Sequence, residues 1–261
     1  MHRNARPVKG LPEVPKDMKR FLSVLGTLIL GLALSRPGTG QPSRAVAQNP
    51  VTAIDILLEP DATMVERAKA ANHRLFTMYP KGFRLGNDHQ PHISCLQRYV
   101  RTADLGKVYE AVGKVLAGEK PTSWMLKAYK YDFAVWDKLA ITVIVVEPTA
   151  DLIRYQQRLI EAVAPFTVKT GTAAAFVTTP KEPDINRSTI DYVATYVPAA
   201  SGTKFIPHVT VGVALPEDVK KMVSEKFDTF TFSPVGASVY QLGNFGTARK
   251  KLKSWELNPL N

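Results

Sequence analysis

The feature that most constrains the fold of this chain is an order of segments that occurs twice. The aliphatic run TAIDILLEP, residues 52–60, ends in Glu-Pro, and so does ITVIVVEP, residues 141–148. Both runs are rich in β-branched and aliphatic residues, which is typical of buried strands. An internal repeat of this kind predicts two similar halves that pack as lobes about a pseudo-two-fold axis.

The segments that follow each run also correspond. Helical periodicity recurs in both halves, over residues 62–79, 102–118, 149–164 and 216–227. Strand-like segments close the halves, over residues 123–137 and 230–257. Thr149 stands where a helix-starting residue belongs. We therefore expect one bilobal domain over residues 48–261, with lobes at about 50–137 and 138–258.

The halves differ in one respect, which is an insertion in the second. Pro60 and His92 are 32 residues apart, whereas Pro148 and His208 are 60 apart. The additional residues should lie within about 166–204, where TPKEPD and PAASG are typical of loops. The segment STIDYVATYV, between these loops, predicts an added strand.

Each half contains the same short motif, PHIS at residues 91–94 and PHVT at residues 207–210. Side chains alternate along a strand, so His92 and Ser94 share one face while Ile93 and Cys95 share the other. His208 and Thr210 share a face in the same way. The repeat therefore predicts two histidines and two hydroxyls that face one another across a central cleft.

Four such groups suit the chemistry of a phosphodiester. A histidine titrates near neutrality, so a pair can hold one neutral base and one protonated acid. One imidazole would activate water or a ribose hydroxyl, and the other would protonate the departing ribose oxygen. Ser94 and Thr210 could donate hydrogen bonds to the phosphate oxygens, and no step requires a metal.

At these two motifs the chain resembles the two-histidine (2H) phosphoesterases, in particular the 2'-5' RNA ligase-like and cyclic phosphodiesterase proteins. The resemblance covers most of residues 50–258. It implies an α+β fold of two mainly antiparallel sheets with flanking helices around the cleft. It also implies metal-independent hydrolysis of 2',3'-cyclic phosphates or related nucleotide phosphodiesters, with 2'-5' RNA ligase-like activity in reverse. His92 and His208 would be catalytic, and Ser94 and Thr210 would bind phosphate.

Several other residues are candidates for substrate binding. Arg98 could pair with phosphate and Tyr99 could stack on a base, but a surface ion pair and a core ring are equally compatible with the pattern. Phe205 precedes His208 by three residues and could wall a base pocket, and Phe245 could border the cleft. Core packing is the alternative for both rings. Cys95 falls on the apolar face, which favours a core residue over a nucleophile.

The sequence indicates no cofactor and no metal. It contains neither a GxxxxGK[ST] phosphate loop nor a GxGxxG fingerprint. His89 precedes His92 by three residues, but Pro91 intervenes, and no carboxylate or cysteine cluster completes a metal site. Cys95 is the only cysteine, so an intramolecular disulfide is excluded.

The first 47 residues are typical of a leader. A basic MKR at 18–20 precedes an apolar run at 21–34, and Ala45-Val46-Ala47 forms a small-residue cleavage site. We expect a signal peptide with its core at residues 18–47 and an exported protein, periplasmic or secreted. The alternative is an uncleaved segment that anchors the protein to the membrane.

Charge limits the partners. The whole chain carries +11, but the leader accounts for eight Lys or Arg and two Asp or Glu, which leaves about +5 on the remainder. This surface does not suit a protein that coats duplex DNA. The expected partner is a nucleotide or an RNA end, with membrane contact only through the export signal and no stable protein partner, so we expect a monomer. The alternative function is a noncatalytic RNA- or nucleotide-binding module.

Overall fold

The computed structural model describes residues 50–257 except for residues 88, 137 and 181. The leader that we predict over residues 1–47 lies outside the described residues, so export stays a prediction. Among the helices of the described part, none is long and apolar enough to cross a membrane.

Within the described residues, nine strands form one antiparallel sheet in two groups. The first half-sheet contains β2 (Ile93–Arg101), β1 (Val51–Pro60), β8 (Pro234–Leu242) and β9 (Ala248–Glu256), in that spatial order. The second half-sheet contains β6 (His208–Ala214), β4 (Leu139–Val146), β3 (Leu126–Trp136) and β7 (Phe230–Phe232). The short strand β5 (Thr167–Val168) pairs with β2.

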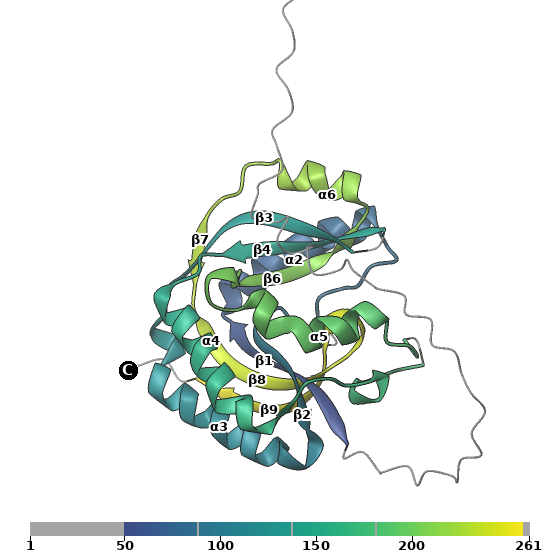
Figure 1. Ribbon diagram of the computed structural model, residues 1–261. Helices are drawn as coiled ribbons and strands as arrows, with labels where there is room; N and C mark the ends of the chain where they lie inside the picture. Colours follow the sequence, from purple (N-terminus) through teal and green to yellow (C-terminus); the bar gives the residue numbers. More distant parts are fainter. Residues whose placement is uncertain (1–49, 88, 137, 181, 258–261) are drawn as a thin grey trace, which may run out of the picture. The chain divides into compact units, whose positions relative to one another are not determined.

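The two half-sheets meet at a narrow seam. Ile93 of β2 pairs with Val209 of β6, and the described strands show no second pair between β2 and β6. Outward from this seam, each half-sheet continues with its Glu-Pro strand and then a closing strand. In Figure 1 strands β3, β4 and β6 lie above strands β1, β8 and β9. The α+β class is confirmed, and the two expected sheets are joined into one curled sheet.

The half-sheets are not built from the two consecutive segments that the repeat predicts. Strand β3 pairs with β4 in the second half-sheet, whereas β8, close to the C-terminus, pairs with β1. The reason is that β3 and β4 are neighbours in sequence and form an antiparallel hairpin, so the boundary that we placed between 137 and 138 falls inside it. Each half of the repeat therefore contributes its closing strand to the other half-sheet.

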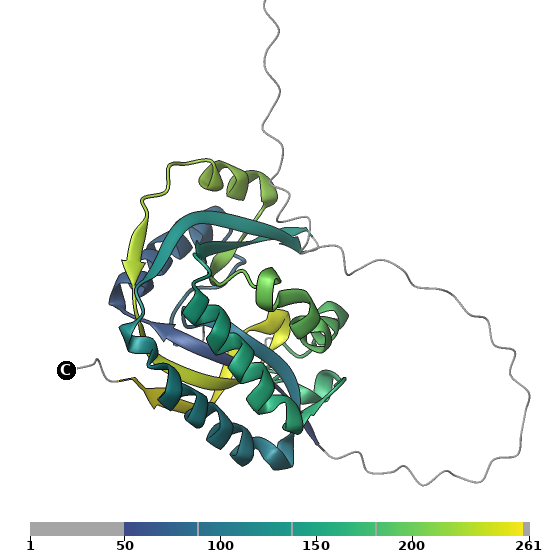
Figure 2. The same ribbon diagram turned by 60° about the vertical axis from the view of Figure 1, so that its left-hand side comes forward.

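Helices are exchanged in the same way. They are α2 (Ala62–Met78), α3 (Leu105–Glu119), α4 (Ala150–Val163), α5 (Arg187–Ala200) and α6 (Pro216–Val223). Helix α2 follows β1 but contacts β6, and α4 follows β4 but contacts β2. Figure 2 shows α3 beside α4, while α6 packs on β3 and β4. This exchange joins both halves of the repeat in one core.

Local signals explain where two of these helices begin. The Asp61 side chain accepts a hydrogen bond from the backbone N–H of Met64 at 3.3 Å, and Thr149 accepts one from Leu152 at 3.2 Å. Such caps satisfy N–H groups that have no partner in the first turn. The helix start that we predict at Thr149 is confirmed.

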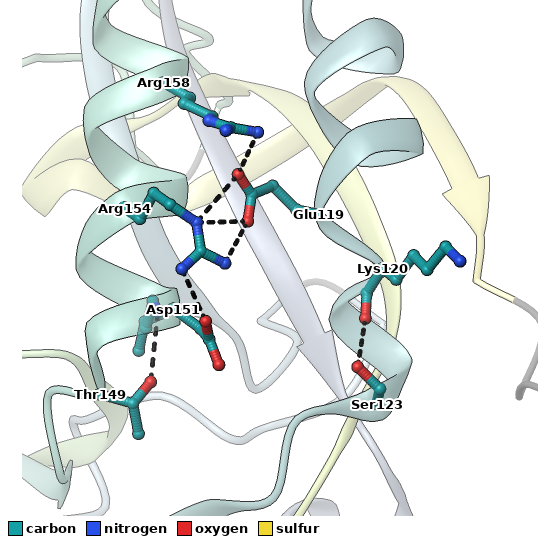
Figure 3. A network of polar contacts seen from close by, with 8 residues as sticks. Glu119, Lys120, Ser123, Thr149, Asp151, Arg154 and Arg158 are labelled. Carbon is teal, nitrogen blue, oxygen red and sulfur yellow. Dashed lines mark hydrogen bonds and ion pairs between the residues drawn. The ribbon is translucent and has the colours of Figure 1, made fainter.

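An ion-pair network ties α3 to α4 (Figure 3). The Glu119 side chain is 1% exposed and lies 2.8 Å from Nη2 of Arg154 and 2.6 Å from Nη1 of Arg158. Arg154 also contacts Asp151, so this cluster of charges is balanced within the protein. A buried carboxylate with two guanidinium partners is a structural feature, and it holds α3 at the end that precedes β3.

The segment STIDYVATYV is helical and not the added strand that its β-branched residues predict. Helix α5 begins after Asn186, whose side chain accepts a hydrogen bond from the N–H of Thr189 at 2.7 Å. Its buried residues recur at helical spacing, at Thr189, Val193, Tyr196 and Ala200. Burial of this stripe outweighs the weak helix propensity of its β-branched and aromatic residues.

Helices α5 and α4 cover an edge of β2 that the seam leaves open. On the edge that faces β6, the described part of β2 pairs with β6 at Ile93 and next with β5 at Tyr99, and no strand pairs with the residues in between. The Tyr196 hydroxyl donates to the carbonyl oxygen of Ser94 at 3.2 Å, and Nε2 of Gln156 donates to that of Cys95 at 3.1 Å. These bonds satisfy backbone carbonyl groups that a neighbouring strand would otherwise pair, at the end of the first histidine motif.

Candidate active site

Two histidines at the seam are held in the same way. Nδ1 of His92 lies 2.7 Å from the carbonyl oxygen of Gln90, and Nδ1 of His208 lies 2.7 Å from that of Ile206. A carbonyl oxygen can only accept, so each Nδ1 carries a proton and donates it. In the neutral ring, Nε2 then has the lone pair that can take up a proton.

The seam brings the two motifs together. Ile93 and Val209 are buried in the core, so the residues on either side of them lie on the opposite surface, as side-chain alternation predicts. We call this surface the histidine face; it carries His92, Ser94, His208 and Thr210. In antiparallel register the residue before one partner lies beside the residue after the other, so His92 lies toward Thr210 and Ser94 toward His208.

The surroundings of His208 favour its neutral form. Burial lowers the pKa of His208 below its ordinary value of 6.5, and the nearby charge of His92 lowers it further. The hydrogen bond to Ile206 and the charge of Asp132 act in the opposite direction, with smaller effect than burial. A neutral imidazole at neutral pH suits a general base.

A buried carboxylate beside His92 is the main site residue that sequence reasoning missed. Asp55 is fully buried, and its Oδ2 atom accepts hydrogen bonds from Ser94 Oγ at 2.5 Å and Gln97 Nε2 at 3.2 Å. Nε2 of His92 lies 3.8 Å from the same oxygen. Burial raises the pKa of Asp55, and the positive charge of His92 and the two hydrogen bonds oppose that rise.

Asp55 makes the two halves of the site chemically different. When the two Glu-Pro ends are aligned, Val143 occupies in ITVIVVEP the position that Asp55 occupies in TAIDILLEP. A carboxylate therefore accompanies His92 from the neighbouring strand, whereas a valine stands at the equivalent position near His208. The signal was available in the sequence, because a lone acidic residue inside a buried aliphatic strand requires a partner.

A bulge in β2 moves one predicted binding residue, Arg98, away from the histidine face. Ile56 is paired with Leu96 and Leu57 with Ser94, so Cys95 has no partner on β1, and both Cys95 and Leu96 lie in the core. Beyond this extra residue the alternation is inverted. Arg98 is consequently in register with Ile54, on the core side of the strand, and not on the histidine face.

Tyr99, Phe205 and Cys95 are packed residues. Tyr99 is on the same side as the histidines, but it is 1% exposed, and its hydroxyl donates to the carbonyl oxygen of Ile190 at 2.9 Å. It therefore anchors α5 and offers no ring face to a base. Phe205 is 5% exposed within the main core. Cys95 is buried, and burial raises the pKa of its thiol, which disfavours the nucleophilic thiolate.

The described residues include no group of three or more His, Cys, Asp and Glu side chains placed to hold a metal ion.

Similar folds occur among solved structures. TT0787 of Thermus thermophilus is 13% identical, with a TM-score of 0.48 over 80% of this chain and 100% of that chain. E. coli LigT complexed with 3'-AMP is 13% identical, with a TM-score of 0.40 over 80% of this chain and 99% of that chain. A structure described as a phosphoesterase is 12% identical, with a TM-score of 0.32 over 79% and 99%.

No protein-family model and no curated protein sequence matches the chain.

Proposed function

We propose that this protein is a phosphodiesterase that opens 2',3'-cyclic phosphates or related nucleotide phosphodiesters with two histidines as general acid and general base. The observation that carries the proposal is the matched pair of imidazoles at the seam. Each ring donates from Nδ1 to a carbonyl oxygen two residues earlier, at 2.7 Å in both cases, so both Nε2 atoms belong to the histidine face. A hydroxyl residue accompanies each ring.

The asymmetry around Asp55 supports a division of roles for hydrolysis. His208, whose pKa burial lowers, takes a proton from water through Nε2, and the water oxygen attacks phosphorus. The bond between phosphorus and one ribose oxygen breaks, and that oxygen receives the proton from Nε2 of His92. Oδ2 of Asp55 lies 3.8 Å from Nε2 of His92, so a carboxylate stands beside the ring that gives up its proton. The product is a phosphomonoester; His208 has gained one proton from water, and His92 has lost one to the ribose oxygen.

Ser94 contributes to phosphate binding in a way that depends on Asp55. While Asp55 is ionised, the Ser94 hydroxyl donates to it, at 2.5 Å, and has no proton to offer to phosphate. Burial raises the pKa of Asp55, and only the protonated carboxyl, which carries no charge to act on His92, would donate to Ser94 and free its hydroxyl hydrogen for a phosphate oxygen. In the ionised state that acts on His92, Asp55 instead holds the Ser94 hydroxyl in place. Thr210 serves as the second hydroxyl on the histidine face.

The division of roles predicts where activity falls at acidic pH. Because the base must be neutral and burial lowers the pKa of His208, kcat/KM for adenosine 2',3'-cyclic phosphate should fall only below pH 6.5, the ordinary value for histidine. A pH–rate profile from pH 4 to 10 measures this limb. An acidic limb that begins above pH 6.5 as the pH is lowered would exclude His208 as the base.

A substrate panel followed by ³¹P NMR tests the reaction class. In buffer with EDTA, the protein should convert adenosine 2',3'-cyclic phosphate to a monophosphate and leave adenosine 3'-monophosphate unchanged. Persistence of activity with the chelator is expected because the two imidazoles perform both proton transfers. Binding of the cyclic phosphate without any product would instead favour a noncatalytic nucleotide-binding module.

A further inference from the structure

Three aromatic side chains from separate parts of the chain meet beside the histidine face. Trp136 ends β3, Tyr192 lies on α5, and Phe245 lies in the short turn Asn244–Gly246 between β8 and β9. The ring centroid of Trp136 is 6.2 Å from that of Tyr192 and 6.3 Å from that of Phe245. We call these three residues the aromatic cluster. Its three rings come, in that order, from the second half-sheet, from the insertion and from the first half-sheet.

A chain of contacts connects the aromatic cluster to the first histidine motif, and an electrostatic interaction connects it to Asp55. The ring of Tyr192 lies 5.7 Å from that of Tyr196, whose hydroxyl donates to the carbonyl oxygen of Ser94. The charge of Asp55 also acts on Tyr192, whose pKa is raised mainly by burial. Tyr192 is therefore placed near Ser94 and Asp55, on the side of the site where the proposed general acid lies.

The other two rings, those of Phe245 and Trp136, also lie close to residues of the site. A Cβ placed on Gly246 would lie 3.5 Å from Oε1 of Gln97, whose amide nitrogen donates to Asp55, so the turn with Phe245 passes over that pair. On β3, Tyr131 and Phe133 pack against the core, so Asp132 and Trp136 lie on the opposite surface. Asp132 is close enough for its charge to act on His208.

Phe245 has a conformation and an exposure that packing does not explain. Its backbone lies in the left-handed region, at φ 57 and ψ 20, which a side chain with Cβ adopts at a cost. The side chain is also 52% exposed, so little burial offsets that cost. The turn is held by bonds to α5, where Thr189 Oγ1 accepts from the N–H of Phe245 at 3.0 Å. Strain retained at an exposed ring is typical of a binding site.

We propose that the aromatic cluster binds the nucleobase of the substrate, with the exposed ring of Phe245 stacking on the base. This inference rests on the proposed function, because it takes the phosphodiester to lie between His92 and His208. In a nucleoside 2',3'-cyclic phosphate, one ribose separates phosphate from base, so the base must lie at the margin of the histidine face. Ring stacking accepts any base, which predicts a preference for nucleotides over base-free esters and little preference among bases.

Phe245→Gly tests the proposal because it removes the ring and also relieves the left-handed backbone. For adenosine 2',3'-cyclic phosphate we expect KM to rise about 5- to 150-fold, as for the loss of one base stack, with kcat little changed. For glycerol 1,2-cyclic phosphate, which has no base, KM should stay the same. The melting temperature should not fall. Phe245→Tyr keeps the ring and should retain the wild-type KM, and Met125→Ala alters an exposed apolar residue outside the aromatic cluster as a control.

Equal changes in KM for both esters, or no change for either, would overturn the base-binding role, and so would a lower melting temperature with unchanged KM. Calorimetric titration with adenosine 3'-monophosphate separates this failure from failure of the proposed function. If the wild-type protein opens neither ester but binds this nucleotide, and Phe245→Gly weakens the binding by a similar factor, the base site stands and the phosphodiesterase does not. If the wild-type protein neither opens the esters nor binds the nucleotide, both proposals fail.

Discussion

Replacing His92 or His208 by alanine is expected to lower kcat for a nucleoside 2',3'-cyclic phosphate by about 10²- to 10⁴-fold, the usual contribution of a positioned acid or base. Each imidazole performs one of the two proton transfers, so neither variant can complete the step without help from water. The double variant should be little worse than the poorer single variant, because the two groups act as one unit. Steady-state kinetics with an HPLC assay of the monophosphate measures all three variants.

Loss of the fold must be separated from loss of chemistry in this comparison. His73→Ala is the matched control, because His73 is an exposed residue of α2 and belongs to neither motif. Wild-type activity in that variant, together with melting temperatures near the wild-type value for all four proteins, would place the effect at the active site. Full activity in His92→Ala or His208→Ala would mean that the histidines only hold the strand ends in place.

Asp55→Asn is expected to lower activity and to raise stability at the same time. Asparagine can still accept from Ser94 and Gln97, but it places no negative charge beside Nε2 of His92, so kcat/KM should fall about 10- to 100-fold, the range of one charge-assisted interaction. At pH 7 the melting temperature should rise by about 2–4 °C, which corresponds to roughly 1 kcal/mol in a domain of this size.

The sign of the stability change follows from the raised pKa of Asp55. A carboxyl whose pKa is higher in the folded than in the unfolded state stabilises the fold below the unfolded value of 3.8, and that contribution is lost as pH rises through the folded pKa. The advantage of Asp55→Asn should therefore shrink as the pH is lowered toward 4. Thermal unfolding at pH 4, 5.5 and 7 measures this trend. Wild-type kcat/KM in Asp55→Asn would mean that Asp55 has a structural role only.

Side-chain alternation was enough to predict the histidine face, because a two-residue period needs only the local strand. His92 with Ser94, and His208 with Thr210, lie opposite core residues as expected. The same rule fails beyond Cys95, where one unpaired residue inverts the alternation and moves Arg98 to the other side of the strand. A bulge depends on the partner strand, so a single strand sequence does not reveal it.

The local sequence also could not predict which distant segments pair or pack with one another. The repeat predicts which segments are equivalent, but not that β3 and β8 close the half-sheet of the other repeat. In α5 the β-branched residues predict a strand, and the helix forms because Thr189, Val193 and Tyr196 are buried together. The aromatic cluster joins three elements that lie far apart in the sequence, and only the tertiary fold brings Trp136 to Phe245.

Catalysis by the two histidines is tested by single-turnover hydrolysis of adenosine 2',3'-cyclic phosphate in buffer with EDTA. The wild-type, His92→Ala and His208→Ala proteins are each used in molar excess over the substrate. Catalysis by the two histidines predicts complete conversion to a monophosphate by the wild-type protein and a rate at least about 100-fold lower in both variants. Conversion that stops when EDTA is added, or that continues at the wild-type rate without either histidine, would contradict it.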